Sequence, residues 1–141
     1  MNAPRYPLGR AWLTLTGALV LHVADEAAHD FLSVYNPAVR ALRETIPWLP
    51  LPTFSFGIWL TGLVLAVMVL FVFTPVAVHG RRWIIVAALV YAFLMLGNGT
   101  LHLAYSVYSR APMPGVWSAP LLLAAAGWLW LEARRARRES T

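Results

Sequence analysis

The chain has 141 residues, 60% of them hydrophobic and 12% charged, and its formal net charge is +5. Such an apolar composition is unusual for a soluble domain and predicts a single-domain membrane protein. All eleven basic residues are arginines in short clusters between apolar runs, a pattern that argues against a nucleic-acid-binding surface, and the lack of cysteine excludes disulfides and thiolate chemistry.

Four apolar stretches predict four membrane-spanning helices. Only helices and closed barrels satisfy their backbone polar groups in lipid, and these stretches lack the two-residue alternation of barrel strands. The predicted fold class is therefore all-α, a polytopic four-helix bundle that occupies residues 1–141 as one transmembrane domain. The predicted helices are 11–34, 55–78, 83–106 and 116–133.

The first helix is unusual because its apolar part, residues 11–24, has only 14 residues. At about 1.5 Å per residue this is about 21 Å, whereas a hydrocarbon core of about 30 Å needs about 20 residues. Continuation to Val34 makes the helix long enough, and Asn36 with Pro37 then supplies a stop and a helix restart. We therefore expect residues 22–30 to lie in the outer half of the membrane.

The segment 36–54 is too rich in proline to span a membrane, since it contains four prolines. We expect a short interfacial helix over 37–46, followed by a bent connection on the outer side of the membrane. Together with the loop 110–115, this segment is expected to cover the outer end of the bundle.

The arginines orient the predicted helices. Eight of them precede the first helix, join the second to the third, or follow the fourth, and only three lie on the other side. The positive-inside rule then places both termini in the cytoplasm of a multi-pass protein of the bacterial inner membrane. Arg5 and Arg10 before a short apolar core would also fit a cleaved signal peptide, but no clear small-residue cleavage site precedes Asp25.

Ionisable residues concentrate in the stretch HVADEAAHD, which begins at His22. Positions i, i+3, i+4 and i+7 share one face of a helix. The residues of this face are His22, Asp25, Glu26 and His29, with Asp30 at its edge.

The third predicted helix carries a second polar stripe, formed by Asn98, His102 and Tyr105 at i, i+4 and i+7. Counted from the cytoplasmic arginines at about 1.5 Å per residue, both stripes reach the same depth near the outer boundary. A lone ionisable group in lipid costs about 2.5 to 3.5 kcal/mol, so we expect the two stripes to face each other and form a polar pocket. His79, at the cytoplasmic end, is expected to be an interfacial loop residue.

A metal ion is one interpretation of this pocket, because imidazole and carboxylate groups on facing helices suit a single zinc or iron ion. A complete di-iron site is not expected, since the second and fourth helices offer no intramembrane His, Asp or Glu. Haem bound by His22 or His29 with His102 is a weaker alternative. The expected metal ligands are His22, Glu26, His29 and His102.

Metal-free proton transfer is a second interpretation, in which a buried carboxylate and a histidine exchange protons with a hydrophobic or lipid-like ligand. The catalytic acid/base role would fall to His22, Glu26 and His102. The residues expected to contact or orient the ligand are Asp25, His29, Asn98 and Tyr105.

Two interpretations without catalysis remain open. The polar groups could form a hydrogen-bonded knot that fixes helix packing, or the protein could be a structural subunit that assembles with partner membrane proteins. The sequence leaves open whether the chain is an enzyme.

The motif HVADE, residues 22–26, resembles the signature of the HXXEE family of small bacterial integral membrane proteins, with Asp25 in place of the first Glu. NGTLH, residues 98–102, resembles the Asn-x-x-x-His of that family, and Pro114-Gly115 followed by SAPLLL resembles its closing turn and last helix. This resemblance implies that the chain carries the polar site of that family. The family has no established activity, so the resemblance implies none for this chain.

HVADE is also similar, more loosely, to the His-x-x-x-Glu of the emopamil-binding-protein superfamily, which includes sterol isomerases and lipid-binding membrane proteins. That similarity would imply that His22 and Glu26 shuttle protons.

Overall fold

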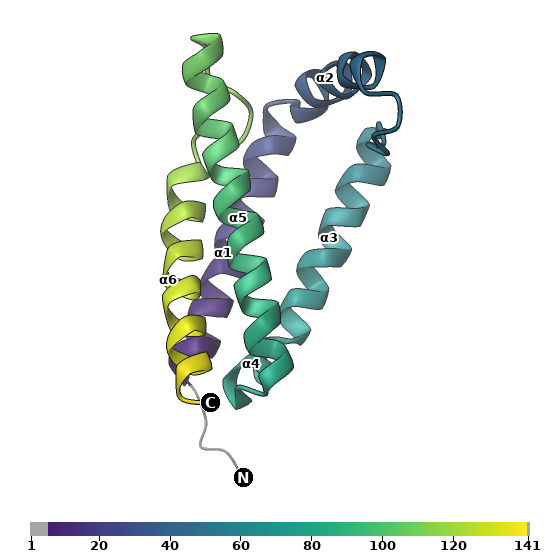
Figure 1. The fold of residues 1–141 in the computed structure, drawn as a ribbon. Coiled ribbons are helices and arrows are strands. Elements are labelled where there is room, and N and C mark those ends of the chain that lie inside the picture. The colour runs from purple at the N-terminus through teal and green to yellow at the C-terminus, as the bar shows by residue number, and fades with distance from the viewer. Residues whose placement is uncertain (1–5, 141) are drawn as a thin grey trace.

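The computed structural model describes residues 6–140, which form six α-helices and no β-strand. Helices α1, α5 and α6 lie side by side, α3 inclines away from them, and α2 crosses the end where α1 and α3 are farthest apart (Figure 1). The all-α prediction is confirmed for these residues. The helices are α1 (Tyr6–Ala28), α2 (Phe31–Thr45), α3 (Phe56–Val72), α4 (Thr74–His79), α5 (Arg82–Ser109) and α6 (Ala119–Arg138).

The core lies between α1, α5 and α6. Leu15 of α1, Ile85 of α5 and Leu129 of α6 are almost completely buried there. A Cβ atom added at Gly99 of α5 would lie 2.8 Å from Cγ of Leu123 in α6. Small residues at such a crossing let two helix backbones approach closely, as is common between membrane helices. Close packing of α5 on α6 thus sets the position of the long helix that carries His102.

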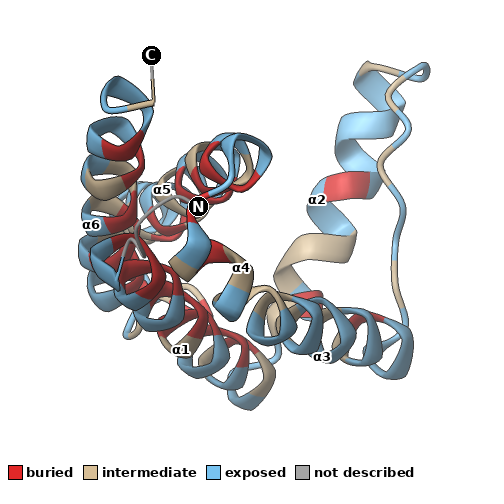
Figure 2. Cartoon of the chain, turned by 90° about the horizontal axis from the view of Figure 1, so that it is seen from below, coloured by how far each residue is buried: buried red, intermediate tan, exposed pale blue. Residues whose placement is uncertain are grey.

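Helix α3 is apolar on nearly all sides and touches the bundle along only one. Trp59 is its one buried residue, and Leu63 and Val67 pack partly against the core. Met68 and Val72, on other sides of the helix, are exposed. Figure 2 shows this exposure along most of α3 and the buried residues gathered between α1, α5 and α6.

The first helix differs from its prediction at both ends. It begins earlier, at Tyr6, and ends at Ala28 instead of continuing to Val34. Asp30 adopts the left-handed conformation (φ 53°, ψ 56°), and α2 begins at Phe31. A short polar side chain tolerates this conformation better than most residues do. The 23 residues of α1 extend about 34 Å at ~1.5 Å per residue, so the helix reaches a membrane-spanning length without the predicted continuation.

The expected stop at Asn36 and Pro37 is also wrong, because both residues lie inside α2. Asn36 instead anchors the connection that leads to α3. Its Nδ2 donates to the carbonyl oxygen of Phe54 at 2.9 Å, and its Oδ1 accepts from the backbone N–H of Phe54 at 3.0 Å. The helix expected over 37–46 is therefore the second part of α2, which ends at Thr45.

Two helical segments are long and apolar enough to cross a membrane, by length and composition alone. They are Phe56–His79, with a mean hydropathy of 2.6, and Arg82–Ser109, with a mean hydropathy of 2.0. They correspond to the predicted spans 55–78 and 83–106. Helices α1 and α6, which carry more polar and charged residues, do not meet the same measure.

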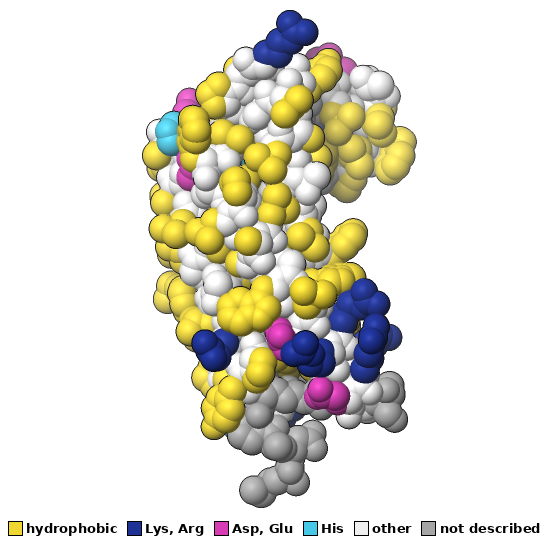
Figure 3. Space-filling view, turned by 90° about the vertical axis from the view of Figure 1, so that its left-hand side faces the viewer, with side chains coloured by type: hydrophobic (Ala, Val, Ile, Leu, Met, Phe, Trp, Pro, Cys, Tyr) yellow, Lys and Arg dark blue, Asp and Glu magenta, His cyan; other side chains and the backbone are white. Residues whose placement is uncertain are grey.

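The start of α1 and the end of α6 lie at the same end of the molecule (Figure 1). On the face shown in Figure 3, arginine side chains gather toward this end, and apolar side chains cover much of the surface above them. Both ends of the described chain therefore share one side of the bundle.

Candidate metal centre

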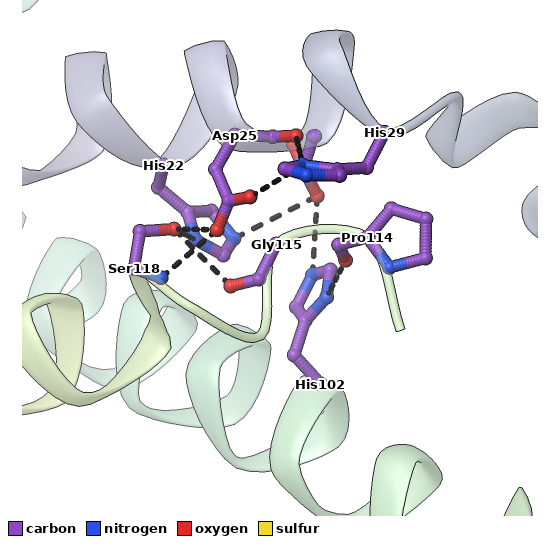
Figure 4. Close-up of polar contacts among 8 residues, drawn as sticks. His22, Asp25, His29, His102, Pro114, Gly115 and Ser118 are labelled. Atoms are coloured by element: carbon purple, nitrogen blue, oxygen red, sulfur yellow. Dashed lines mark hydrogen bonds and ion pairs between the residues drawn. The ribbon is translucent and has the colours of Figure 1, made fainter. Parts of the chain in front are cut away.

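Four polar or charged side chains are buried in the described part of the chain, and three of them meet at one point. His22 and Glu26 come from α1 and His102 comes from α5. Figure 4 shows the His22 and His102 side chains extending toward each other from these two helices. Their exposed fractions are 0%, 5% and 2%. The sequence analysis selected all three as site residues, and the structure brings them together.

Glu26 lies between the two imidazole rings. Its Oε1 is 3.1 Å from Nε2 of His102 and 3.6 Å from Nε2 of His22. Two ligand atoms about 2.1 Å from one tetrahedral ion are about 3.4 Å apart. One ligand atom from each of the three residues lies within 4.8 Å of the other two. The three side chains therefore have the spacing of ligands to a single ion.

The turn after α5 orients His102. Its Nδ1 lies 2.6 Å from the carbonyl oxygen of Pro114. A carbonyl oxygen only accepts hydrogen bonds, so Nδ1 carries the hydrogen and donates it. In the neutral ring, Nε2 then presents a lone pair to Glu26. Histidines that bind metals in proteins usually donate their second ring N–H to a carbonyl or carboxylate in this way.

Ser118 and Asp25 orient His22 in a similar way. Nδ1 of His22 is 2.8 Å from Oγ of Ser118. The single hydroxyl hydrogen of Ser118 is directed to Oδ2 of Asp25 at 2.8 Å or to the carbonyl oxygen of Gly115 at 3.1 Å. The hydroxyl must therefore accept the hydrogen bond from His22, and the neutral His22 ring also presents its Nε2 lone pair to Glu26.

Two imidazole lone pairs and a carboxylate thus face one another in a buried space. Nε2 of His22 has no hydrogen-bond partner, which is unusual for a buried nitrogen. A proton shared by Glu26 and His102 would satisfy that pair and leave Nε2 of His22 without a partner. A cation that contacts all three groups satisfies every one of them.

Gly115 packs directly on the site. Its φ of +88° lies in the left-handed region, which favours glycine, and a Cβ atom there would lie 2.8 Å from Nδ1 of His102 and 3.0 Å from Cγ of Glu26. The backbone of the turn between α5 and α6 therefore covers the histidine and the carboxylate and leaves no room for a side chain. This part of the expected cover over the site, the 110–115 loop, is present.

His29 and Asp25 lie at the edge of the site. The His29 side chain is 52% exposed, and its Nδ1 lies 2.9 Å from both Oδ1 and the carbonyl oxygen of Asp25. The His29 ring contacts Asp25 at the end of α1 and does not join the group of three. Asp25 acts on the site through Ser118, whose backbone N–H and hydroxyl both donate to its Oδ2.

The structure does not bring Asn98 and Tyr105 into the site. Asn98 is half-buried, and among the described residues no hydrogen bond joins its side chain to the three site residues. Tyr105 is 43% exposed, and its ring lies 6.5 Å from that of Tyr108. Asp30 is exposed at the break between α1 and α2, and His79 is exposed at the end of α4, as expected for an interfacial residue.

Sequence reasoning missed the groups that orient the histidines. Ser118 and the backbone of Pro114 and Gly115 lie just before α6, on a turn that the sequence predicted as a cover over the site but not as a source of hydrogen bonds to the histidines. The Pro-Gly pair was a usable signal, since it predicts a tight turn close to the stripe of His102. That this turn folds back onto both histidines depends on the packing of three helices.

The family described as "Protein of unknown function with HXXEE motif" matches residues 12–129. The motif residues His22, Asp25 and Glu26 are those of the buried site and its edge, and the matched range also contains His102 and Ser118. No curated protein and no solved structure matches the chain, so the looser similarity to the emopamil-binding-protein superfamily has no support from these comparisons. The resemblance drawn from the motifs is thus confirmed over most of the chain, which belongs to the HXXEE family.

Proposed function

We propose that this protein is a membrane metalloprotein in which His22, Glu26 and His102 bind one divalent transition-metal ion. The observation that carries the proposal is the fully buried, unpartnered Nε2 of His22, which points with Nε2 of His102 toward the same carboxylate. A buried polar atom without a partner costs about 1–3 kcal/mol, and coordination removes that cost.

The donor set indicates which ions would bind. Two imidazole nitrogens and one carboxylate oxygen suit zinc or ferrous iron, and three protein ligands leave a coordination position open, as in catalytic sites. When bound, such an ion would polarise a substrate oxygen or lower the proton affinity of a water molecule. Ser118 and the carbonyl oxygen of Pro114 would keep the histidine hydrogens on Nδ1, so that both Nε2 atoms stay available.

The surroundings of the site favour a hydrophobic or lipid-like substrate. The ring of Phe31 in α2 lies 5.8 Å from the ring of His102 and 5.8 Å from that of Trp59 in α3, so an aromatic surface leads from the site toward α3. The segment Phe56–His79, which comprises α3 and α4, is the more apolar of the two candidate spans. We propose that α1, α3–α4, α5 and α6 all cross the bacterial inner membrane, with both termini in the cytoplasm and the site in the outer half.

Metal analysis tests the proposal directly. The full chain would be purified in detergent without a polyhistidine tag, and its zinc and iron contents measured by mass spectrometry. We expect about one ion per chain. His22→Ala and His102→Ala should each lower the content to a small fraction of that value, and Glu26→Gln, which keeps the side-chain shape, should do the same.

His79→Ala is the matched control, because it removes a histidine at the end of α4, far along the chain from the motif, and should leave the metal content unchanged. Circular dichroism and gel filtration would show that the variants remain folded. A parent protein that holds no stoichiometric metal and gains no thermal stability from added zinc or ferrous iron would overturn the proposal.

Metal-free acid/base chemistry is the second candidate function, and the 3.1 Å contact between His102 and Glu26 favours it because that pair can share a proton. A metal-free protein that retains a lipid-like molecule through purification, and loses it in the His22→Ala/Glu26→Ala double variant, would support this candidate instead.

A further inference from the structure

An arginine-lined pocket lies between α5 and α6, near the end of the bundle where α6 finishes. It has a volume of about 300 Å³ and is lined by Leu89, Trp130, Arg134, Arg137 and Arg138. We propose that this pocket binds the phosphate headgroup of an anionic phospholipid. This proposal is independent of the metal site.

A second pocket continues the first. It has a volume of about 230 Å³, shares Arg137 with the first pocket, and adds Arg82, Ile85 and Val86. The two pockets therefore form one region in which arginines from α5 and α6 converge beside apolar side chains of α5. An anionic amphiphile could bind here, with its charged headgroup at the arginines and its apolar chains along the apolar side chains.

Among the residues that the structure describes, the two pockets are lined by four arginines and by no acidic residue. Glu132 pairs with Arg135 at 3.3 Å, and Arg135 lines neither pocket. Arg82 donates to the backbone carbonyl oxygen of Ser140 at 3.2 Å, and this acceptor carries no net charge. Glu139 follows the arginines at the end of α6. Arginine presents its donors in a planar fork that matches phosphate oxygens, so phosphate is the anion that this region suits best.

The position of the pocket favours a lipid over a free phosphate ion. Trp83 is 50% exposed and Trp128 is 37% exposed, and both lie on the helices that form the pocket. Exposed tryptophans in membrane proteins gather at the level of the headgroups, and basic pockets between helices on the cytoplasmic side bind anionic headgroups. Val86 and Val90 of α5, both 54% exposed, would lie along the acyl chains.

A positively charged helix end has a simpler role, since cations stabilise the C-terminus of a helix and set membrane topology. Arg135 serves those roles as well as its neighbours do but lines neither of the two pockets. It is therefore the matched control: Arg135→Gln removes the same charge from the same helix.

The test compares lipid binding by the full chain in neutral detergent, using native mass spectrometry. Phosphatidylglycerol, phosphatidylcholine and inorganic phosphate would be titrated separately. We expect phosphatidylglycerol to bind more tightly than phosphatidylcholine, and inorganic phosphate at millimolar concentration to displace it poorly. Arg134→Gln/Arg137→Gln should weaken phosphatidylglycerol binding about 25-fold, or about 5-fold per arginine, whereas Arg135→Gln should change it less than 2-fold.

The two-charge control is Arg81→Gln/Arg135→Gln. If it weakens phosphatidylglycerol binding as much as Arg134→Gln/Arg137→Gln does, binding depends only on net charge and the proposal is overturned. Inorganic phosphate that competes as well as the lipid would overturn the lipid assignment. The single variant Arg134→Gln, with an expected loss of about 5-fold, keeps the test decisive if the double variant does not fold.

Discussion

At the scale of single residues, Ser118 has the largest effect that the sequence did not reveal. It connects two residues of the family motif, because it accepts from His22 and donates to Asp25. The Asp25 carboxylate, one methylene shorter than the glutamate that the motif name specifies, reaches both the hydroxyl and the backbone N–H of Ser118. The motif therefore contains two residues of the group of three, His22 and Glu26, and one, Asp25, that helps to orient His22 through Ser118.

Ser118→Ala should weaken metal binding without removing a ligand. The variant deprives His22 of its acceptor and Asp25 of a hydroxyl donor, so we expect metal affinity to fall about 10- to 100-fold. The free energy of unfolding should fall by about 1–3 kcal/mol, because a buried donor loses its partner. Affinity would be measured by competition with a chromophoric chelator.

Ser55→Ala is the control for this prediction, since Ser55 precedes α3 and its side chain makes no capping hydrogen bond. The orienting role of Ser118 fails if the two serine variants bind metal with the same affinity.

At the scale of helices, periodicity predicted which residues share a face but not where the helix ends. His22 and Glu26 lie one turn apart on α1, as the sequence predicted, and both are buried. His29 lies on the same predicted stripe, yet its ring is half exposed and contacts Asp25, just after the end of α1 at Ala28. One of the four expected metal ligands therefore lies outside the group of three.

The close approach of α5 and α6 can be tested with two glycines on the same helix. Gly99→Ala places a Cβ atom 2.8 Å from Leu123 and 3.3 Å from the carbonyl oxygen of Ala119, so we expect it to lower the free energy of unfolding by about 1–3 kcal/mol. Gly97→Ala meets no atom within 4 Å and should leave stability unchanged or raise it by up to about 1 kcal/mol. Thermal unfolding in detergent would measure both.

Equal melting temperatures for the two glycine variants would show that α5 and α6 are farther apart than the structure has them. A loss of stability in Gly99→Ala that is accompanied by loss of metal would further show that this contact positions His102.

At the scale of the whole molecule, the helices divide into a packed bundle, formed by α1, α5 and α6, and a largely exposed helix, α3. Helices α1, α5 and α6 enclose the core, while α3 presents apolar side chains such as Val64 and Met68 outward. Exposed apolar surface of this extent is typical of a protein that contacts lipid or another membrane protein. His22 and Glu26 lie near the end of α1 and the arginine-rich pocket lies near the end of α6. Figure 1 shows that these two helix ends lie toward opposite ends of the bundle.

The proposed topology can be tested with single cysteines, because the natural chain has none. Glu44 lies on α2 and Glu139 follows α6, and both are exposed. In cells with a permeabilised outer membrane, an impermeant maleimide should label Glu44→Cys and should label Glu139→Cys only after the inner membrane is broken. The physical reason is that the arginine-rich end remains in the cytoplasm.

The reverse labelling pattern would contradict the predicted orientation. Equal labelling of both cysteines before lysis would contradict the three spans, α3–α4, α5 and α6, that are proposed to lie between them. The parent protein, which has no cysteine, gives the background level of maleimide labelling.

The sequence by itself determined the helical fold, the apolar character of the two candidate spans and the three residues that converge in the buried site. These properties are local, since hydropathy and the 3.6-residue helical period depend on neighbouring residues alone. The helical period alone therefore predicted that His22 and Glu26 share one face of the first helix.

Only the tertiary structure decided that Ser118 lies against His22, 96 residues earlier in the chain, and that the turn at Pro114 holds His102. Such contacts depend on where α1 ends, how closely α5 packs on α6 and how the turn between them folds back. None of these is a property of neighbouring residues, which is why the three residues of the buried site could be predicted and the groups that orient the histidines could not.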